Sequence, residues 1–313
     1  MRVLVIGASG AIGARLVPRL RERGHEVIGT ARSTGKAGQL RALGAEPVVL
    51  DLLDARAARQ VVLDARPEAI IHQATALADA GFSRNLDRTF AQTNRLRTEG
   101  TDTLLAAARE AGVRRFVAQS FAPFRYAREG GPVKTEDDPL DPAPPKTARQ
   151  GSAAMRHLDE AVTAAGGIAL RYGGFYGAAN DGLVPAVRKR QFPIVGDGGG
   201  VMSFIHLDDA AAATVLALED GRSGVYNITD DEPAPVRDWL PVLAEALGAG
   251  PPRHAPRWLA RLIMGDGLVM ITGARGASNA KAKAEFGWTL RYPSWRQGFA
   301  AAYRPREPVR AGA

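Results

Sequence analysis

Apolar and polar positions along the chain alternate between short apolar runs and longer amphipathic stretches. Val3–Ile6 is an apolar run with the length of a buried strand, and Ala14–Arg23 continues with helical spacing. Gly24 ends that stretch, and His25–Thr30 then predicts a second strand. The beginning of the chain therefore predicts a strand–helix–strand unit of about 30 residues.

The same alternation continues as far as residue 171. Further strands are predicted at Pro47–Leu50, Ala69–His72, Arg115–Gln119 and Ile168–Arg171, and helices at Ala55–Asp64, Asn94–Glu110 and Ser152–Ala165. Apolar strands that alternate with amphipathic helices indicate an α/β protein with a doubly wound parallel sheet covered on both faces. Gly224–Ile228 predicts one more strand, which we expect to return to this sheet.

These elements divide the chain into two parts. We expect a larger nucleotide-binding domain of residues 1–171 plus 204–230. Residues 172–203 plus 231–303 are expected to form a smaller C-terminal substrate lobe over the strand ends, and residues 304–313 a flexible tail. Ligands of such sheets bind at the carboxyl ends of the strands, so the site is expected between the two parts.

A glycine-rich turn connects the first strand to the first helix. Its three glycines follow the spacing Gly7-x-x-Gly10-x-x-Gly13. Glycine allows positive φ and close backbone approach, and a helix N-terminus offers free N–H groups to a pyrophosphate. In this strand–turn–helix context the motif predicts dinucleotide binding by a Rossmann fold. The residues expected to line the cradle are Gly7, Ser9, Gly10, Ala11, Ile12 and Gly13.

The end of the second strand indicates which dinucleotide binds. It reads Thr30-Ala31-Arg32-Ser33 and has no carboxylate, whereas NAD-binding proteins usually carry an acidic residue there for the ribose hydroxyls. A carboxylate would repel a 2′-phosphate, and a guanidinium would bind it. We therefore expect Arg32 and Ser33, helped by the Thr30 hydroxyl, to select NADP(H).

Composition narrows the class of protein. The chain has 313 residues, 45% hydrophobic and 24% charged, without any cysteine, so disulfides and thiolate metal ligands are excluded and no metal site is expected. The net charge is +8, but the arginines are scattered singly along helices, which argues against a nucleic-acid partner. No apolar run approaches the roughly 20 residues of a membrane span. A cytoplasmic enzyme that acts on a small molecule is expected.

Further motifs give the chain a family resemblance over nearly its whole length. They are Asp51-Leu52, Leu170-Arg171-Tyr172, Tyr176-Gly177, Gly196-Asp197-Gly198, Ser203–Ala210, Phe286-Gly287-Trp288 and Tyr292-Pro293-x-Trp295. Together with the glycine turn, this ordered set resembles the extended short-chain dehydrogenase/reductases, the branch that includes nucleotide-sugar epimerases and dehydratases.

The resemblance implies positions along the cofactor and between subunits. Asp51, with Leu52, would hold the adenine amino group, and Gln73, Ala74 and Thr75 would line the groove toward the nicotinamide. In relatives, two helices that correspond to residues 94–110 and 152–165 pair into a dimer interface, so the resemblance implies a homodimer. The Ala and Leu patches of both helices fit ordinary core faces as well.

The chain departs from this family at the catalytic residues. Catalytic members use a Tyr with a Lys four residues later, and the Lys lowers the pKa of the Tyr that transfers the proton. None of the six tyrosines here has a Lys four positions on, and residues 144–152, where the pair should lie, contain no Tyr. Ser120 remains as a hydrogen-bond donor to the substrate, and Tyr172 as a proton donor from an unfamiliar direction.

The expected substrate pocket is more apolar than in nucleotide-sugar enzymes. Val201-Met202 stands where those members place an Arg for the diphosphate. The aperiodic, proline-rich stretch 121–151 is long enough to act as a lid or binding segment. The residues expected to line the pocket are Phe121, Phe124, Tyr126, Gly174, Phe192 and Met202. Phe121, Phe124, Phe192 and Met202 fit a hydrophobic core equally well.

Three functions remain open on these observations. The first is an atypical NADPH-dependent reductase that transfers hydride to a ketone or quinone-like carbonyl without the Tyr/Lys pair. The second is a nucleotide-sugar epimerase or dehydratase, which the fold favours and the missing residues disfavour. The third is a non-catalytic NADP-binding sensor or regulator. The fold alone does not determine the chemistry, so we judge by the residues of the site. These favour the reductase.

Overall fold

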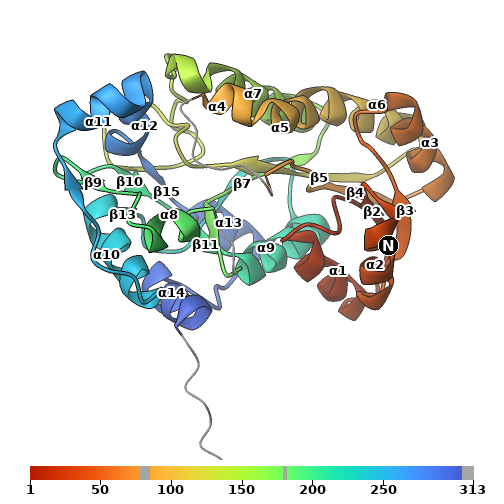
Figure 1. Cartoon of the computed structure of the whole chain (residues 1–313). Coiled ribbons are helices and arrows are strands. Elements are labelled where there is room, and N and C mark those ends of the chain that lie inside the picture. Colours follow the sequence, from red (N-terminus) through yellow and green to blue (C-terminus); the bar gives the residue numbers. More distant parts are fainter. Residues whose placement is uncertain (78–84, 179–181, 305–313) are drawn as a thin grey trace, which may run out of the picture.

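The computed structural model describes residues 1–77, 85–178 and 182–304, and these form one large parallel sheet with a smaller lobe at its strand ends (Figure 1). The sheet has seven strands in the order β3-β2-β1-β4-β5-β7-β12, all paired in parallel. They are β1 Arg2–Ile6, β2 Glu26–Ala31, β3 Glu46–Val49, β4 Ala69–His72, β5 Arg115–Phe121, β7 Ile168–Tyr172 and β12 Gly224–Ile228. The order reverses between β1 and β4, which opens a crevice at their carboxyl ends. The predicted Rossmann fold is confirmed.

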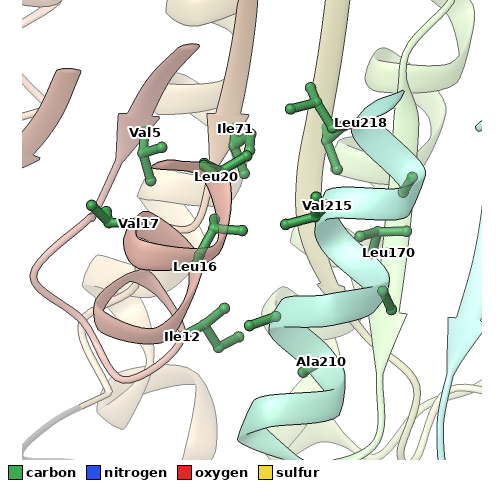
Figure 2. Packing of buried hydrophobic residues seen from close by; sticks show 14 of the residues in the cluster. Val5, Ile12, Leu16, Val17, Leu20, Ile71, Leu170, Ala210, Val215 and Leu218 are labelled. Carbon is green, nitrogen blue, oxygen red and sulfur yellow. The ribbon is translucent and has the colours of Figure 1, made fainter. Parts of the chain in front are cut away.

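Two layers of helices cover the sheet. The first face carries α1 (Gly13–Glu22) and α9 (Leu207–Asp220), and the second carries α3 (Ala55–Ala65), α6 (Thr101–Glu110) and α7 (Arg149–Ala164). Figure 2 shows Leu16 and Leu20 of α1 beside the sheet residue Ile71, with α9 covering the neighbouring strands. Because successive residues of β1 enter opposite cores, the strand needs an uninterrupted apolar run.

The helix predicted at residues 94–110 is interrupted. It consists of α5 (Ala91–Arg95), a π-helical turn at Leu96–Gly100 and α6. A Cβ at Gly100 would lie 2.9 Å from Leu52 Cδ2, so the turn passes directly over the loop after β3. The other short helices of this half are η1 Thr34–Lys36, α2 Ala37–Ala42, α4 Leu86–Thr89 and η3 Lys146–Ala148.

The lobe is built from short strand pairs and helices around an aromatic core. Its pairs are β8 Gly174–Tyr176 with β11 Phe204–His206, β9 Ile194–Val195 with β14 His254–Ala255, and β10 Val201–Met202 with β13 Ala234–Pro235. Its helices include α8 Val184–Arg188, α10 Val236–Ala246 and α14 Trp295–Tyr303. Phe204 lies at the centre, with ring centroids 5.1 Å from Trp239 and 5.4 Å from Phe299.

One C-terminal segment leaves the lobe and returns to the large sheet. After β15 (Gly276–Ala277), α13 (Ala280–Phe286) packs against α9 and β12. Phe286 and Trp288 belong to the core on the α1/α9 face. The stretch 231–303, which was expected wholly in the lobe, therefore contributes to both parts.

The predicted aperiodic stretch 121–151 has some structure. Tyr126 forms an isolated bridge to Leu140, and β6 (Val133–Lys134) pairs with β15. Among the described residues, the structure has no helix that combines the length and the hydrophobicity of a membrane span. The predicted tail lies outside the described residues except for Arg304, which pairs with Glu245.

Candidate active site

The glycine turn after β1 has the geometry of a phosphate cradle. Gly7 has φ 83°, and a Cβ there would lie 2.9 Å from the backbone of Ala74 at the end of β4. A Cβ at Gly13 would lie 2.5 Å from Ala8 O, so the first turn of α1 packs directly on the loop. Gly10 donates its N–H to Gly7 O at 3.0 Å and is exposed. The glycines at positions 7 and 13 are thus required by close contacts.

The start of α1 presents donors without partners. Within the described ranges, the N–H groups of Ala11 and Ile12 make no hydrogen bond, and the first turn of α1 contains no acidic residue. Ala11 is exposed, Ser9 is half-buried, and Ile12 is buried. Free N–H groups and the positive end of a helix dipole bind phosphate oxygens, so these residues fit a dinucleotide pyrophosphate.

Arg32 follows the last residue of β2 and is exposed, as is Ser33. Among the described residues Arg32 has no ion pair or hydrogen-bond partner. Thr30, in contrast, is buried, and its Oγ1 accepts a hydrogen bond from Gly7 N at 3.0 Å. The Thr30 hydroxyl thus connects the glycine turn to β2. Because Thr30 is buried, its hydroxyl is not available to a 2′-phosphate.

Asp51 and Leu52 follow β3 at the same edge of the sheet. Asp51 is exposed, and its Oδ1 accepts a hydrogen bond from Leu53 N at 3.0 Å. The helix cap of α3 is Asp54, which accepts from Ala57 N. The other carboxylate oxygen of Asp51 has no hydrogen-bond partner among the described residues, which fits the expected contact with an adenine amino group. The buried Leu52 packs under the π-helical turn.

Tyr172 is the last residue of β7, and its hydroxyl belongs to a chain of three hydrogen bonds. Its hydroxyl accepts from Gln73 Nε2 at 3.1 Å and lies 2.6 Å from Thr214 Oγ1, which itself donates to Ala210 O. The phenol proton is therefore donated to Thr214. Tyr172 is fully buried, and burial raises its pKa to about 12. This side chain is a weak acid without exposed surface.

Gln73 and the two residues after it form the loop beyond β4. Gln73 is buried, and its Oε1 has no partner among the described residues. Ala74 and Thr75 are half-buried, and Ala74 lies against Gly7. The preceding His72 donates through Nε2 to Leu96 O, and burial lowers its pKa to about 4, so it is neutral. The loop fits the wall of the cofactor groove.

Ser120 lies in a buried network of charged residues below α7. Its Oγ accepts from Arg125 Nη1 at 3.0 Å, and it is fully buried. Asp159 of α7 joins Arg125 and Arg171, each at 2.8 Å from its Oδ2. Tyr126 completes the network, because its hydroxyl accepts from Arg171 at 3.2 Å and donates to Asn227 at 2.6 Å. The structure thus places the predicted Ser120 and Tyr126 in the protein interior.

Of the other residues predicted to contact substrate, three lie at the strand ends. Phe121 is half-buried at the end of β5, and Phe124, with φ 65°, packs against the lobe core. Gly174 begins β8, and its N–H donates to Ser203 O at 2.8 Å. Phe192 and Met202 are buried in the lobe core, with Phe192 5.9 Å from the Trp239 ring. Phe192 and Met202 therefore belong to the hydrophobic core of the lobe, which was one of the two interpretations open from the sequence.

The beginning of α7 falls in the stretch 144–152, where the resemblance places the family's acid/base pair. Thr147 precedes the helix, and Gly151 lies in its first turn. The two residues are four positions apart, which is the spacing of the Tyr and Lys in catalytic members of the family. Asp87 accepts hydrogen bonds from Gln150 N and Gly151 N at 3.0 and 2.9 Å. Asn94 is buried 3.7 Å from the position of a Gly151 Cβ, and both of its amide atoms lack a partner among the described residues. Gly151 is therefore flanked by two polar side chains, those of Asp87 and Asn94.

Comparison with known proteins agrees with the motifs. The model of the NAD dependent epimerase/dehydratase family matches residues 3–229. The chain belongs to this family. The resemblance inferred from the sequence is confirmed, and an NAD(P) cofactor is typical of the family.

Relatives within the epimerase/dehydratase family include reductases. A 3-diazoavenalumate denitrifying reductase of a Streptomyces species is 44% identical over 311 residues, which cover 95% of this chain and 99% of that one. A ketoreductase of Stigmatella aurantiaca, which acts on a farnesylated dihydroquinoline oxide, is 31% identical and covers 79% and 74% of the two chains. The expected function is confirmed at the level of a reductase of this family.

Solved structures of epimerases share the fold. UDP-glucose 4-epimerase of Thermotoga maritima superposes with a TM-score of 0.76 at 23% identity, covering 97% of both chains. The Thermus thermophilus enzyme in complex with NAD superposes with a TM-score of 0.70 at 27% identity, covering 97% of this chain and 98% of that one.

Sequence reasoning missed the polar residues that face the start of α7. Asp87 and Asn94 lie seven positions apart on consecutive short helices, a spacing that carries no motif. The network of Arg125, Asp159 and Arg171 was equally hidden, because its members are far apart in sequence. One signal was available, because Arg171 is a charged residue at the end of the otherwise apolar strand Ile168–Tyr172 and requires a buried partner.

Proposed function

We propose that this protein is an NADPH-dependent reductase that delivers hydride to an electrophile without a proton from a protein side chain. The observation that carries the proposal is the hydrogen-bond chain of Tyr172, whose proton is donated to Thr214. At the start of α7, Thr147 and Gly151 offer neither a phenol nor an amine. A substrate suited to this site is one whose reduction creates no oxyanion that must be protonated at once.

The cofactor in this proposal is NADPH, which supplies the hydride when bound. The cradle at Gly7 and Gly13 and the free N–H groups of Ala11 and Ile12 would hold its pyrophosphate. The exposed guanidinium of Arg32, after a strand that ends in Ala31, would pair with the 2′-phosphate.

A diazo-bearing aromatic compound is the first substrate class to test. When hydrogen replaces an aromatic diazonium group, the arriving hydride forms the C–H bond, and the electron pair of the broken C–N bond leaves with dinitrogen. NADPH is oxidised to NADP⁺, and no proton is consumed. The relative from Streptomyces, named for denitrifying 3-diazoavenalumate, supports this class.

A conjugated ketone or quinone is the second candidate. Hydride added to a quinone, or to the conjugated carbon of an unsaturated ketone, leaves a phenolate or enolate stabilised by conjugation, so water can protonate the anion after the hydride has moved. Phe121, half-buried at the end of β5, offers an apolar wall to such a ring. The ketoreductase from Stigmatella supports this candidate. An epimerase or dehydratase is disfavoured, because those reactions need the missing proton transfer.

The test is to incubate purified protein and NADPH with three substrate sets. These are a freshly diazotised aromatic acid, a panel of aryl ketones and quinones, and UDP- and dTDP-glucose. We expect dihydronicotinamide oxidation with the diazotised acid, and a product that carries hydrogen at the former diazo carbon. Dinitrogen release without NADPH oxidation would contradict the first class. Tight NADPH binding without turnover of any set would favour the non-catalytic sensor.

A further inference from the structure

A pair of short helices at the edge of the lobe is almost uncovered. The hairpin consists of α11 (Arg257–Met264), the turn η4 (Gly265–Gly267) and α12 (Leu268–Thr272), and Ala260 is its one buried residue. Trp258 is 67% exposed and Leu262 74%. A contiguous patch of exposed apolar side chains often marks a binding site, whereas single exposed apolar residues are common on any surface.

The two helices and the turn between them line a hollow of about 540 Å³ that is open to solvent on one side. Its walls include Arg257, Trp258, Arg261, Asp266, Leu268 and Val269. This volume lies within the range of small-molecule sites, about 300–1,000 Å³. One tryptophan, two arginines and two aliphatic residues thus contribute to the walls of one space.

The hollow adjoins the candidate active site. Asp266 Oδ2 accepts a hydrogen bond from Lys146 N at 2.7 Å, just before α7. A Cβ at Gly267 would lie 3.4 Å from Thr147 Oγ1, whose hydroxyl has no partner among the described residues. The turn of the hairpin therefore contacts Lys146 and Thr147, which lie in the stretch 144–152 where the resemblance places the family's acid/base pair.

The start of α11 is fixed to the lobe. β14, which precedes it, pairs with β9, and Gly196 N donates to Ala255 O at 3.0 Å. Gly196 has φ 61°, and a Cβ there would lie 2.8 Å from Arg257 Cγ, so the arginine stem lies directly on the glycine. Arg257 is thus positioned by its stem, and the residue as a whole is exposed.

The charges of the hollow favour an anion. Within the described ranges, Arg257 and Arg261 have no ion pair or hydrogen-bond partner. Asp266 is the one acidic lining residue, and its carboxylate is engaged by Lys146 N. Two unpaired guanidinium groups beside an indole ring suit a molecule that combines a carboxylate with an aromatic ring.

We propose that this hollow is the subsite for an aromatic carboxylate substrate. The ring would lie on Trp258 between Leu268 and Val269, and the carboxylate would pair with Arg257 and Arg261. Its place in the reaction rests on the proposed reductase function, whereas the binding itself does not. The hairpin would then direct the far end of the substrate toward Thr147 and the strand ends.

Tryptophan fluorescence can test the site directly. Trp239, Trp288 and Trp295 are all at most 2% exposed, so Trp258 is the tryptophan whose emission responds to a ligand in the hollow. The probes are 3-phenylpropanoate and its neutral amide, added to the full chain with NADP⁺. We expect a saturable blue shift with the carboxylate, which the Trp258→Phe variant loses.

Calorimetric titration of the same probes tests the charge. In the double variant Arg257→Gln, Arg261→Gln, the carboxylate should bind at least about tenfold more weakly, as expected when a charged hydrogen bond is lost. The amide should bind as it does to the unmutated protein. Arg109→Gln, an exposed arginine at the end of α6, is the matched control and should change neither affinity.

Several outcomes would overturn the subsite. They are binding of neither probe, an equal loss for carboxylate and amide in the double variant, or an unchanged shift in Trp258→Phe. Because these readings need no turnover, they do not depend on the reductase proposal. A protein that reduces nothing can still bind the probe, and an active reductase can still fail this test.

Discussion

At the residue scale, Arg32 determines the expected choice of cofactor. Its guanidinium is exposed after β2, and no carboxylate ends that strand. We expect NADP(H) to bind at least tenfold more tightly than NAD(H), a difference of about 1.4 kcal/mol or more. Arg32→Ala should remove most of this preference and leave NAD(H) affinity unchanged, as measured by titration of both cofactors. Equal affinities in the unmutated protein would refute the assignment.

Tyr172 and Ser120 are expected to stabilise the fold, since both hydroxyls are buried and hydrogen-bonded. Tyr172→Phe and Ser120→Ala should each keep single-turnover hydride transfer within about tenfold, because general acid catalysis would contribute 10²–10⁴. Both should lower the free energy of unfolding by about 1–3 kcal/mol, because a buried partner loses its hydrogen bond. A hundredfold slower transfer with intact cofactor binding would restore a catalytic role.

At the element scale, the first turn of α7 depends on a side chain from α4. Asp87 accepts hydrogen bonds from two N–H groups of that turn. Asp87→Ala should lower the free energy of unfolding by about 1 kcal/mol, the usual cost of a lost helix cap. Urea denaturation measures this, with Glu22→Ala, an exposed acid at the end of α1, as the control. A change no larger than that of the control would contradict the capping role.

Beyond the end of β12, Asp230 links stability to pH. It is 1% exposed, and burial raises its pKa to about 8. Between about pH 4 and pH 8 the folded protein thus keeps a proton that the unfolded chain releases. The contribution of Asp230 to the free energy of unfolding should therefore fall as pH rises through that range. Asp230→Asn should flatten this dependence in thermal denaturation from pH 5 to pH 8. An unchanged slope would show that Asp230 is ionised in the folded state.

The strands could be predicted from the sequence because each is specified locally. A strand between two helical layers needs apolar residues on both faces, and Val3–Ile6 and Ala69–His72 show this directly. The π-helical turn at Leu96–Gly100 could not be predicted, because its sequence has ordinary helical spacing. The return of α13 to the large sheet depends on the fit of Phe286 and Trp288 into a distant core.

At the scale of the whole molecule, the cofactor side of the site could be predicted and the substrate side could not. The glycine turn and Arg32 act through backbone shape and local charge, which sequence spacing records. Ser120, Phe192 and Met202 depend instead on which neighbours the folded chain brings to them, and all three are interior residues. The uncovered α11–α12 hairpin likewise becomes visible only when burial is known. The expected homodimer stays a prediction.

The central claim, hydride transfer without a protein proton donor, is best tested by isotope labelling in single turnovers. With deuterium at the transferred position of NADPH, we predict deuterium at the reduced carbon of the product and a slower transfer step. In heavy water with unlabelled NADPH, we predict no deuterium at that carbon and an unchanged rate. A transfer step slowed several-fold by heavy water would show that a proton moves with the hydride, and would contradict the account.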